Sequence, residues 1–314
     1  MLKNKQFDFV GSFKKFVIAS LALILIGVVC TLVFGPVLDI SFKGGTKISY
    51  SYTGDLSTEE VRKLADKTLG KKTTVATTSG VSDESQKIIV SLSDNVALET
   101  KSIDALNEAL TEAYPDSKIE QAEVNSVNPS VGTIFFLKCL VAVVIAAILV
   151  VVYVAFRFRK IGGVSAAVTA LIALVHDVLI AFFATVVLRL NIDANFIAVV
   201  MTLLGYSLNN TIVVFDRIRE NRGAYGSQMP IRDLVNLSDN QVLSRNIMTS
   251  LSTIIAITVV FAVCEVTGLT SLRTLTVPMI VGLVAGSYSS ICIAPPLWVL
   301  WQNRKAAKAS KAGK

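Results

Sequence analysis

Long apolar runs alternate with polar segments along the chain. Six of the runs meet or approach the roughly 20 residues needed to cross a hydrocarbon core about 30 Å thick. Hydrophobic residues make up 53% of the sequence, more than is usual for a soluble domain. The pattern predicts a membrane α-helical protein with six transmembrane helices. The predicted spans are 16–36, 134–156, 162–188, 194–215, 246–264 and 277–301.

The polar stretch between the first two spans has the periodicity of a folded domain. A helix with a capping box at Ser57 and a stop signal at Gly70 follows the first strand pattern. The order β-α-β-β-α-β is the signature of a ferredoxin-like α+β domain. Strands are predicted at 46–52, 73–78, 86–92 and 118–124, and helices at 57–69 and 98–113.

Charge is distributed unevenly and orients the spans. Residues 37–133 contain 10 Lys/Arg and 15 Asp/Glu, a net charge of −5, whereas the rest of the chain carries +12. Basic residues gather at one set of span ends, so the positive-inside rule predicts cytoplasmic termini and an extracytoplasmic ferredoxin-like domain. A signal peptide is the alternative for the first run, but its length and Phe34-Gly35-Pro36 argue against cleavage. The predicted divisions are 1–36 (N-terminus and first helix), 37–133 (external domain), 134–301 (helices two to six) and 302–314 (basic tail).

Two expectations concern the cytoplasmic face. Pro230, Ile231, Leu234 and Val235 predict a short amphipathic helix lying on the membrane between the fourth and fifth spans. The basic tail, 302–314, is expected to be disordered. Its charge suits solubility, with contact to anionic lipid or a ribosome-associated partner as the alternative.

Polar side chains inside the spans are the candidate functional residues, because burying them in a membrane is costly. His176 and Asp177 lie near the middle of the third span, where they are expected to act in transport or in bundle packing. A purely structural hydrogen-bonded pair is the alternative. In the fourth span, Ser207, Asn210 and Thr211 fall on one helical face. We expect that face to line the bundle interior or a water-filled path.

Arg245 begins a second polar stripe, which continues at i+4, i+7 and i+8 with Thr249, Ser252 and Thr253. Its long side chain can extend to the cytoplasmic interface or turn inward along the stripe. The stripe favours the inward orientation.

No enzyme chemistry is indicated. The sequence has no phosphate-binding glycine loop and no nucleophile paired with a base. One His-Asp pair on an apolar helix does not make a metal site, and the four cysteines lie in apolar runs without paired spacing. We therefore predict no metal, no cofactor and no nucleic-acid partner. Four carboxylates of the external domain are expected to be solvated without a role: Glu59, Glu60, Asp83 and Glu84.

Several motifs carry a family resemblance. The segment GYSLNNTIVVFDRIRENR occupies 205–222, ISFKGGT follows the first span, VNPSVG precedes the second and HDV lies in the third. Together they resemble the SecF family, one subunit of the bacterial SecD–SecF complex, over nearly the whole chain. The matching motif residues are Gly205, Tyr206, Asn209, Asp216, Arg217, Arg219 and Glu220, with Phe42, Gly44 and Gly45 in the FxGG motif.

This family belongs to the resistance-nodulation-division superfamily. The resemblance implies an accessory subunit that works with SecD, the SecYEG channel and its ATPase SecA in the bacterial cytoplasmic membrane. It would use proton or sodium motive force to help export preproteins, in contact with the translocating chain and with membrane lipid. The family's essential arginine corresponds to Arg245.

Position 210 departs from the family pattern, in which an aspartate follows GYS-x-N. This chain has Asn210, and an amide cannot take up and release a proton. Three explanations are open: SecD supplies the carboxylate, Asp177 or Asp216 substitutes for it, or coupling is weak or lost. We prefer a SecD carboxylate tuned by Arg245. The candidates for ion relay are Arg245, Asn210, His176, Asp177 and Ser207.

Two other functions stay open. A small-molecule or lipid exporter of the same superfamily would need larger external domains enclosing a cavity. A non-transporting scaffold of the Sec machinery predicts that the polar residues of the spans can be replaced without loss.

Overall fold

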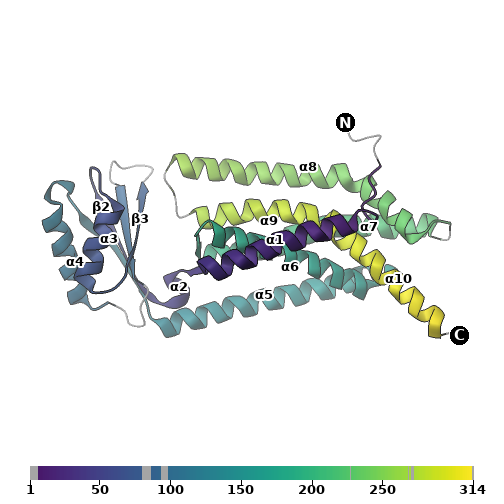
Figure 1. Ribbon diagram of the computed structural model, residues 1–314, viewed down its shortest axis with the longest axis horizontal. Helices are drawn as coiled ribbons and strands as arrows, with labels where there is room; N and C mark the ends of the chain where they lie inside the picture. The colour runs from purple at the N-terminus through teal and green to yellow at the C-terminus, as the bar shows by residue number, and fades with distance from the viewer. Residues whose placement is uncertain are drawn as a thin grey trace.

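The computed structural model describes residues 6–79, 86–92, 98–226, 228–267, 269 and 272–312. The molecule is elongated, with an α/β domain at one end and a helical bundle along the rest of its length (Figure 1). The start of α1 and the end of α10 lie at the end of the bundle remote from the α/β domain. Lys3, Lys5, Asp83, Glu84 and Lys314 fall outside the described residues.

Among the described residues, six helical segments are long and apolar enough to cross a membrane, as predicted. The fourth extends well past the predicted end at residue 215, and the second begins before residue 134. The segments are α1 (Phe13–Phe34), α5 (Pro129–Arg157), α6 (Gly163–Val187), α7 (Ala194–Tyr225), α8 (Ile231–Val266) and the pair α9 (Arg273–Cys292) and α10 (Ala294–Ala312).

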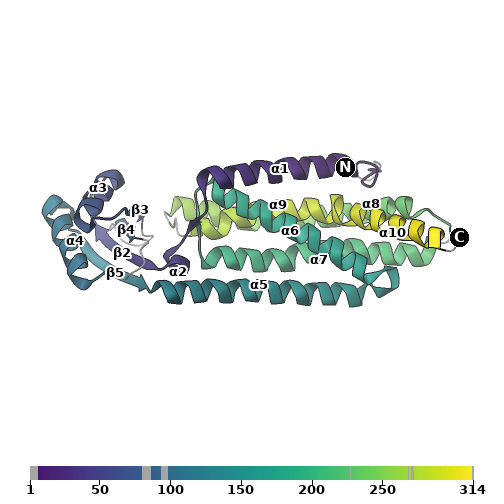
Figure 2. The same ribbon diagram turned by 60° about the horizontal axis from the view of Figure 1, so that its bottom comes forward.

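The bundle has a buried centre and a lipid-like periphery. Helices α6, α7 and α9 pack against one another, whereas α1, α5 and α8 surround them (Figure 2). The peripheral helices expose long rows of Leu, Ile and Val side chains. Phe158, Phe215 and Trp298 fill the main core at the end of the bundle that carries the termini. Exposed apolar surface on this scale is stable only in contact with lipid or partner helices.

The α/β domain has the predicted β-α-β-β-α-β order. Its sheet has the strand order β3-β4-β2-β5, and each neighbouring pair is antiparallel. Tyr50, Ile88 and Leu106 pack between the sheet and the helices. The elements are β2 (Gly45–Tyr52), α3 (Thr58–Leu69), β3 (Thr74–Ser79), β4 (Gln86–Leu92), α4 (Thr100–Ala113) and β5 (Glu120–Val127), with a 3-10 turn at Pro115–Ser117. Gly70 ends α3 in the left-handed conformation, as predicted, but Ser57 makes no side-chain capping bond.

Three short elements join the domain to the bundle. Strand β1 (Val37–Leu38) pairs in parallel with β6 (Asn191–Ile192) in the loop between α6 and α7. Helix α2 (Ile40–Lys43) follows β1 and leads into the sheet. At the opposite end of the bundle, a 3-10 turn (Arg159–Ile161) connects α5 to α6.

The short surface helix predicted from Pro230, Ile231, Leu234 and Val235 is wrong. These residues begin α8, which continues without interruption to Val266, because no glycine or proline breaks the segment. Leu234 and Val235 are fully buried against the bundle core instead of facing a membrane surface. Their apolar spacing is common to a membrane-binding face and a buried helical face, and the structure shows the buried one.

The disordered tail is a second correction. The sixth span turns at Ile293, immediately before Pro295 and Pro296, and α10 then carries the helix through the basic residues to Ala312. Proline is tolerated in the first turn of a helix, where its missing N–H has no partner to lose. The basic segment is therefore an extension of the last span.

Candidate functional site

Asp177 lies where the three central helices meet. Its side chain is completely buried on α6 and accepts hydrogen bonds from Ser207 of α7 (2.5 Å) and Ser289 of α9 (2.8 Å) at the same oxygen, Oδ2. His176 Nδ1 lies 3.0 Å from its other oxygen, Oδ1. Gly286 of α9 allows α9 to lie this close to Ser207 of α7, because the Cβ atom of any larger residue there would lie only 3.0 Å from Ser207 Oγ. The predicted His-Asp pair is thus the polar centre of the bundle.

The polar face of α7 points into the bundle, as its spacing predicts. Ser207, Asn210 and Thr211 are all buried. Asn210 Nδ2 donates to Ser250 Oγ of α8 at 3.2 Å, and Asn246 of α8 donates to the backbone oxygen of Asn210 at 3.4 Å. Thr211 donates to the backbone oxygen of Ser207 at 3.1 Å. Asn210 therefore has a structural partner on α8 and makes no direct bond to the Asp177 cluster.

Other motif residues of α7 lie on its outer face. Gly205 and Asn209 are exposed, one turn apart, while Tyr206 is half-buried. The Tyr206 ring instead packs against a buried cluster that includes Leu203 and Leu283, and its buried hydroxyl has no hydrogen-bond partner among the described residues. Gly205 and Asn209 therefore mark the side of α7 that is open to lipid or to another subunit.

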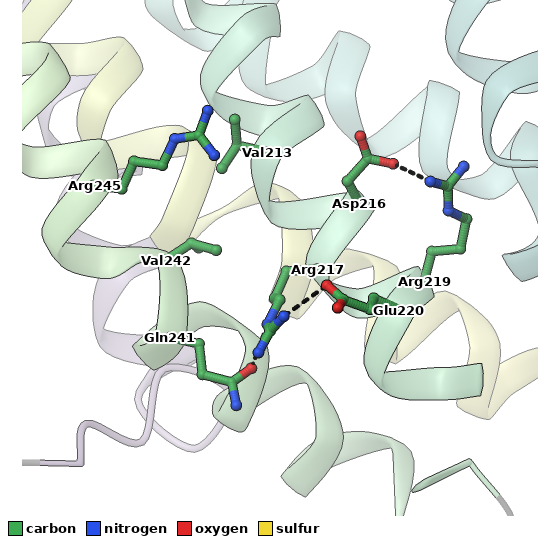
Figure 3. Close-up of a pocket in the computed structure, with 8 residues that line it drawn as sticks. All are labelled: Val213, Asp216, Arg217, Arg219, Glu220, Gln241, Val242 and Arg245. Atoms are coloured by element: carbon green, nitrogen blue, oxygen red, sulfur yellow. Dashed lines mark hydrogen bonds and ion pairs between the residues drawn. The ribbon is translucent and has the colours of Figure 1, made fainter. Parts of the chain in front are cut away.

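The charged end of α7 forms an ion-pair network. Asp216 lies between Arg157 of α5 (3.0 Å) and Arg219 (2.9 Å). Arg217 donates to Glu220 and to Gln241 of α8, each at 2.6 Å (Figure 3). Two arginines therefore engage Asp216 in ion pairs at the charged end of α7.

Arg245 does not turn into the interior of this chain. Its side chain is exposed on α8 and makes no hydrogen bond or ion pair with any described residue. It borders a surface cavity of about 560 Å³ between α7 and α8, beside Val213 (Figure 3). Thr249 and Ser252, from the same stripe, are exposed as well. The predicted inward orientation of Arg245 is therefore wrong for this chain, because Asn246 and Ser250 occupy the buried face of α8.

The FxGG motif packs against the start of α5. Phe42 is buried, with ring centroids 5.6 Å from Phe135 and 5.1 Å from Phe136. Gly44 has φ 82° and ψ 165°, and a Cβ atom there would lie 2.4 Å from Pro129 Cα. FKGG and VNPSVG, two motifs far apart in the sequence, therefore pack against each other at the base of the α/β domain. Gly45, the last residue of the motif, begins β2.

Sequence reasoning missed several buried polar residues, among them Ser289 of α9 and Asp239, Asn246 and Ser250 of α8. Ser289 of α9 lies in an apolar run and gave no signal. Asp239 of α8 is completely buried, and neither carboxylate oxygen has a hydrogen-bond partner in the part of the chain described. Its spacing of i, i+7 and i+11 with Asn246 and Ser250 marks a second polar stripe on α8. No group of three His, Cys, Asp or Glu side chains able to hold a metal occurs among the described residues.

Comparison with known proteins gives a consistent family. Residues 106–304 match the family described as protein export membrane protein SecD/SecF, C-terminal. The chain is 35% identical to protein translocase subunit SecF of Alicyclobacillus acidocaldarius over 98% of this chain and 97% of that protein. It is 31% identical to protein translocase subunit SecDF of Bacillus subtilis over 98% of this chain and 40% of that protein.

A solved structure shares the fold. The crystal structure of SecDF from Thermus thermophilus, described as a translocon-associated membrane protein, aligns with a TM-score of 0.79 and 29% sequence identity. The alignment covers 96% of this chain and 39% of that one, so this chain corresponds to about two fifths of SecDF. The chain belongs to the SecF family of protein translocase subunits.

Proposed function

We propose that this chain is an accessory subunit of the Sec translocase which, paired with SecD, uses ion motive force to drive or complete preprotein export. The observation that carries the proposal is the exposed polar face of α7 and α8. Intramembrane polar groups, including a cation, face away from this chain's own bundle, where only a partner or water can satisfy them. The exposed side chains without a hydrogen-bond partner among the described residues are Asn209 of α7 with Arg245 and Thr249 of α8. Thr202 and Ser252 are exposed on the same helices, but their hydroxyls donate to backbone oxygens one turn away or less.

SecD is the partner that suits this face. Relatives named SecDF align to this chain over only about two fifths of their length, which leaves room for a second half in the same polypeptide. A SecD helix bearing a carboxylate would neutralise Arg245 and supply the acid that position 210 lacks. The same role implies further contacts, with SecYEG, SecA, the preprotein and lipid.

The proposed orientation places both termini in the cytoplasm and the ferredoxin-like domain outside. Arg157, Arg159, Arg217 and Arg219 cluster at the bundle end opposite the α/β domain, which the positive-inside rule assigns to the cytoplasm. A domain beyond the outer surface can contact a preprotein as it emerges.

Within this chain, the ion-relay role falls to the groups that surround Asp177. His176 and Ser207 bind its carboxylate, Asn210 links α7 to α8, and Arg245 faces the proposed SecD carboxylate. A buried carboxyl group at the junction of three helices couples its charge state to their packing, because desolvating its charged form is costly.

Arg245→Ala should abolish the response of export to an imposed proton gradient. The assay follows completion of a preprotein in inverted membrane vesicles containing this chain, SecD and the Sec channel, with and without the gradient. Arg304→Ala is the matched control, since Arg304 is exposed on α10 beyond the core of the bundle. Equal responses in the two variants would contradict the role of Arg245. If wild type ignores both proton and sodium gradients while depletion of the chain still slows export, the scaffold function is correct.

Asn210→Asp should leave gradient-dependent export within about a factor of two of wild type. The aspartate can accept a hydrogen bond from the Ser250 hydroxyl. The α7–α8 contact is therefore preserved, with Ser250 as the donor in place of residue 210. The acid would be redundant if another carboxyl group already carries the ion. A changed ion preference or a large gain in coupling, measured in the same vesicles, would instead show that this position limits transport.

A further inference from the structure

Asp239 is a buried acidic residue to which the proposed function assigns no role. It lies in the first third of α8, is fully buried, and neither of its oxygens receives a hydrogen bond from a described residue. Isolated carboxylates are rarely tolerated in such surroundings, because the lost hydration is not replaced. The group must bind a proton or a cation.

Neighbouring hydrogen-bond donors on α8 are committed elsewhere. The Ser238 hydroxyl donates to Leu234 O at 2.7 Å. Asn240 donates to Phe7 O at 2.9 Å and to Asn236 O at 2.7 Å. No donor adjacent in the sequence is left to stabilise a negative charge on Asp239.

The charged groups of the packed elements also face away. In the N-terminal segment Asp8 pairs with Arg232 at 2.6 Å, and on α7 Arg217 pairs with Glu220 at 2.6 Å. The basic residues of α10, including Arg304, are exposed. On α9 the Cys292 thiol lines a cavity together with Leu243, one turn beyond Asp239. A cation would need several oxygen ligands, which these surroundings do not offer.

Two rows of side chains lie between Asp239 and the Asp177 cluster. Along α8, Asn246 and Ser250 continue the buried stripe to Asn210 of α7, whose neighbour Thr211 bonds to the Ser207 backbone. Along α9, Cys292 and Tyr288 lie one turn apart, and the Tyr288 ring centroid is 6.1 Å from that of His176. The Nε2 atom of His176 is buried without a described partner. A cavity of about 280 Å³ is lined by Tyr288, Cys292 and Leu243, one turn beyond Asp239.

We propose that Asp239 is a proton-binding site at the cytoplasmic end of the bundle, an acid of this chain that acts in addition to the carboxylate proposed for SecD. The inference rests on the proposed ion-coupled function. In the closed packing Asp239 holds a proton. When the helices move and water reaches it, the carboxyl O–H bond breaks, the proton enters cytoplasmic water and a carboxylate remains. A proton arriving from the Asp177 side then restores the neutral group and the closed packing.

The binding step is tested by infrared spectroscopy of the full chain in lipid nanodiscs across a pH titration. Wild type should show a protonated-carboxyl stretch that disappears as the pH rises. This band should be absent in Asp239→Asn, shifted in frequency in Asp239→Glu and unchanged in Asp233→Asn, whose carboxyl group is exposed on the same helix. Identical spectra for wild type and Asp239→Asn would overturn the proposal. The Glu variant keeps the test decisive if the Asn variant fails to fold.

The transport step is tested in the vesicle export assay. In Asp239→Asn the ratio of export rates with and without the gradient should fall to unity, while Asp239→Glu and Asp233→Asn keep a ratio above it. If wild type and Asp239→Asn respond equally to the gradient, ion coupling stands and the role of Asp239 is refuted. If the infrared band titrates but wild type ignores every gradient, the proton site stands and the proposed coupling fails.

Discussion

Replacing Gly44 with alanine should destabilise the protein by about 2–6 kcal/mol. Its backbone lies in a region that is essentially restricted to glycine, which costs another residue about 1–3 kcal/mol. The new methyl group would also collide with the Pro129 backbone, and overpacking of this kind costs about 1–3 kcal/mol more. Chemical denaturation of the full chain in detergent measures the loss.

Gly54→Ala separates the two contributions to this loss. Gly54 also has positive φ, at 95°, but nothing lies within 4 Å of its added Cβ atom. It should lose only the backbone part, about 1–3 kcal/mol. If the two variants lose equal stability, the contact between the FxGG motif and α5 contributes nothing, and the base of the α/β domain is held by other residues.

Asp177→Ala should be the most damaging substitution inside the bundle, with a loss of about 2–6 kcal/mol and no detectable gradient-dependent export. Removing the carboxylate leaves the Ser207 hydroxyl and the Nδ1 atom of His176 without a partner, and each unsatisfied buried group costs about 1–3 kcal/mol. The Ser289 hydroxyl keeps a longer bond to Gly286 O. Thermal unfolding in detergent and the vesicle export assay measure the two losses.

Asp177→Asn distinguishes structure from proton binding at the same position. The amide oxygen can still accept from both serine hydroxyls, and the amide nitrogen can donate to a neutral His176 ring. Stability should therefore stay within about 2 kcal/mol of wild type, whereas gradient-dependent export should be lost. Normal gradient-dependent export in this variant would mean that Asp177 has a purely structural role.

The sequence predicts the architecture well because its strongest signals are periodic. Apolar runs locate all six spans, and alternating patterns give the order of strands and helices in the α/β domain. Errors arise at the boundaries. The surface helix predicted at 230–235 and the disordered tail both fall where helices project beyond the apolar run. Local polarity does not show that α8 continues through residues 230–235, whereas the packing of Leu234 against the core does.

The candidate site is predicted less completely. Spacing on one helix identifies the buried face of α7, but it cannot say which of two polar stripes on α8 faces inward. The stripe headed by Arg245 lies outside, and the one containing Asp239 lies inside, because Asn246 packs against Asn210. Contacts such as Ser289 with Asp177 join residues more than a hundred positions apart, and no local pattern encodes them.

The contacts at the two ends of α1 have a consequence for the order of folding. One end of α1 is held through β1 by residues 191–192, and the segment before its other end is held by Arg232, Asn236 and Asn240. These partners emerge from the ribosome long after α1 itself. Closing such long loops is slow, so the segment before α1 must remain without its partners until α8 is made. A chain truncated before residue 232 should therefore leave that end of α1 unanchored, while β1 keeps its pairing with β6 at the other end.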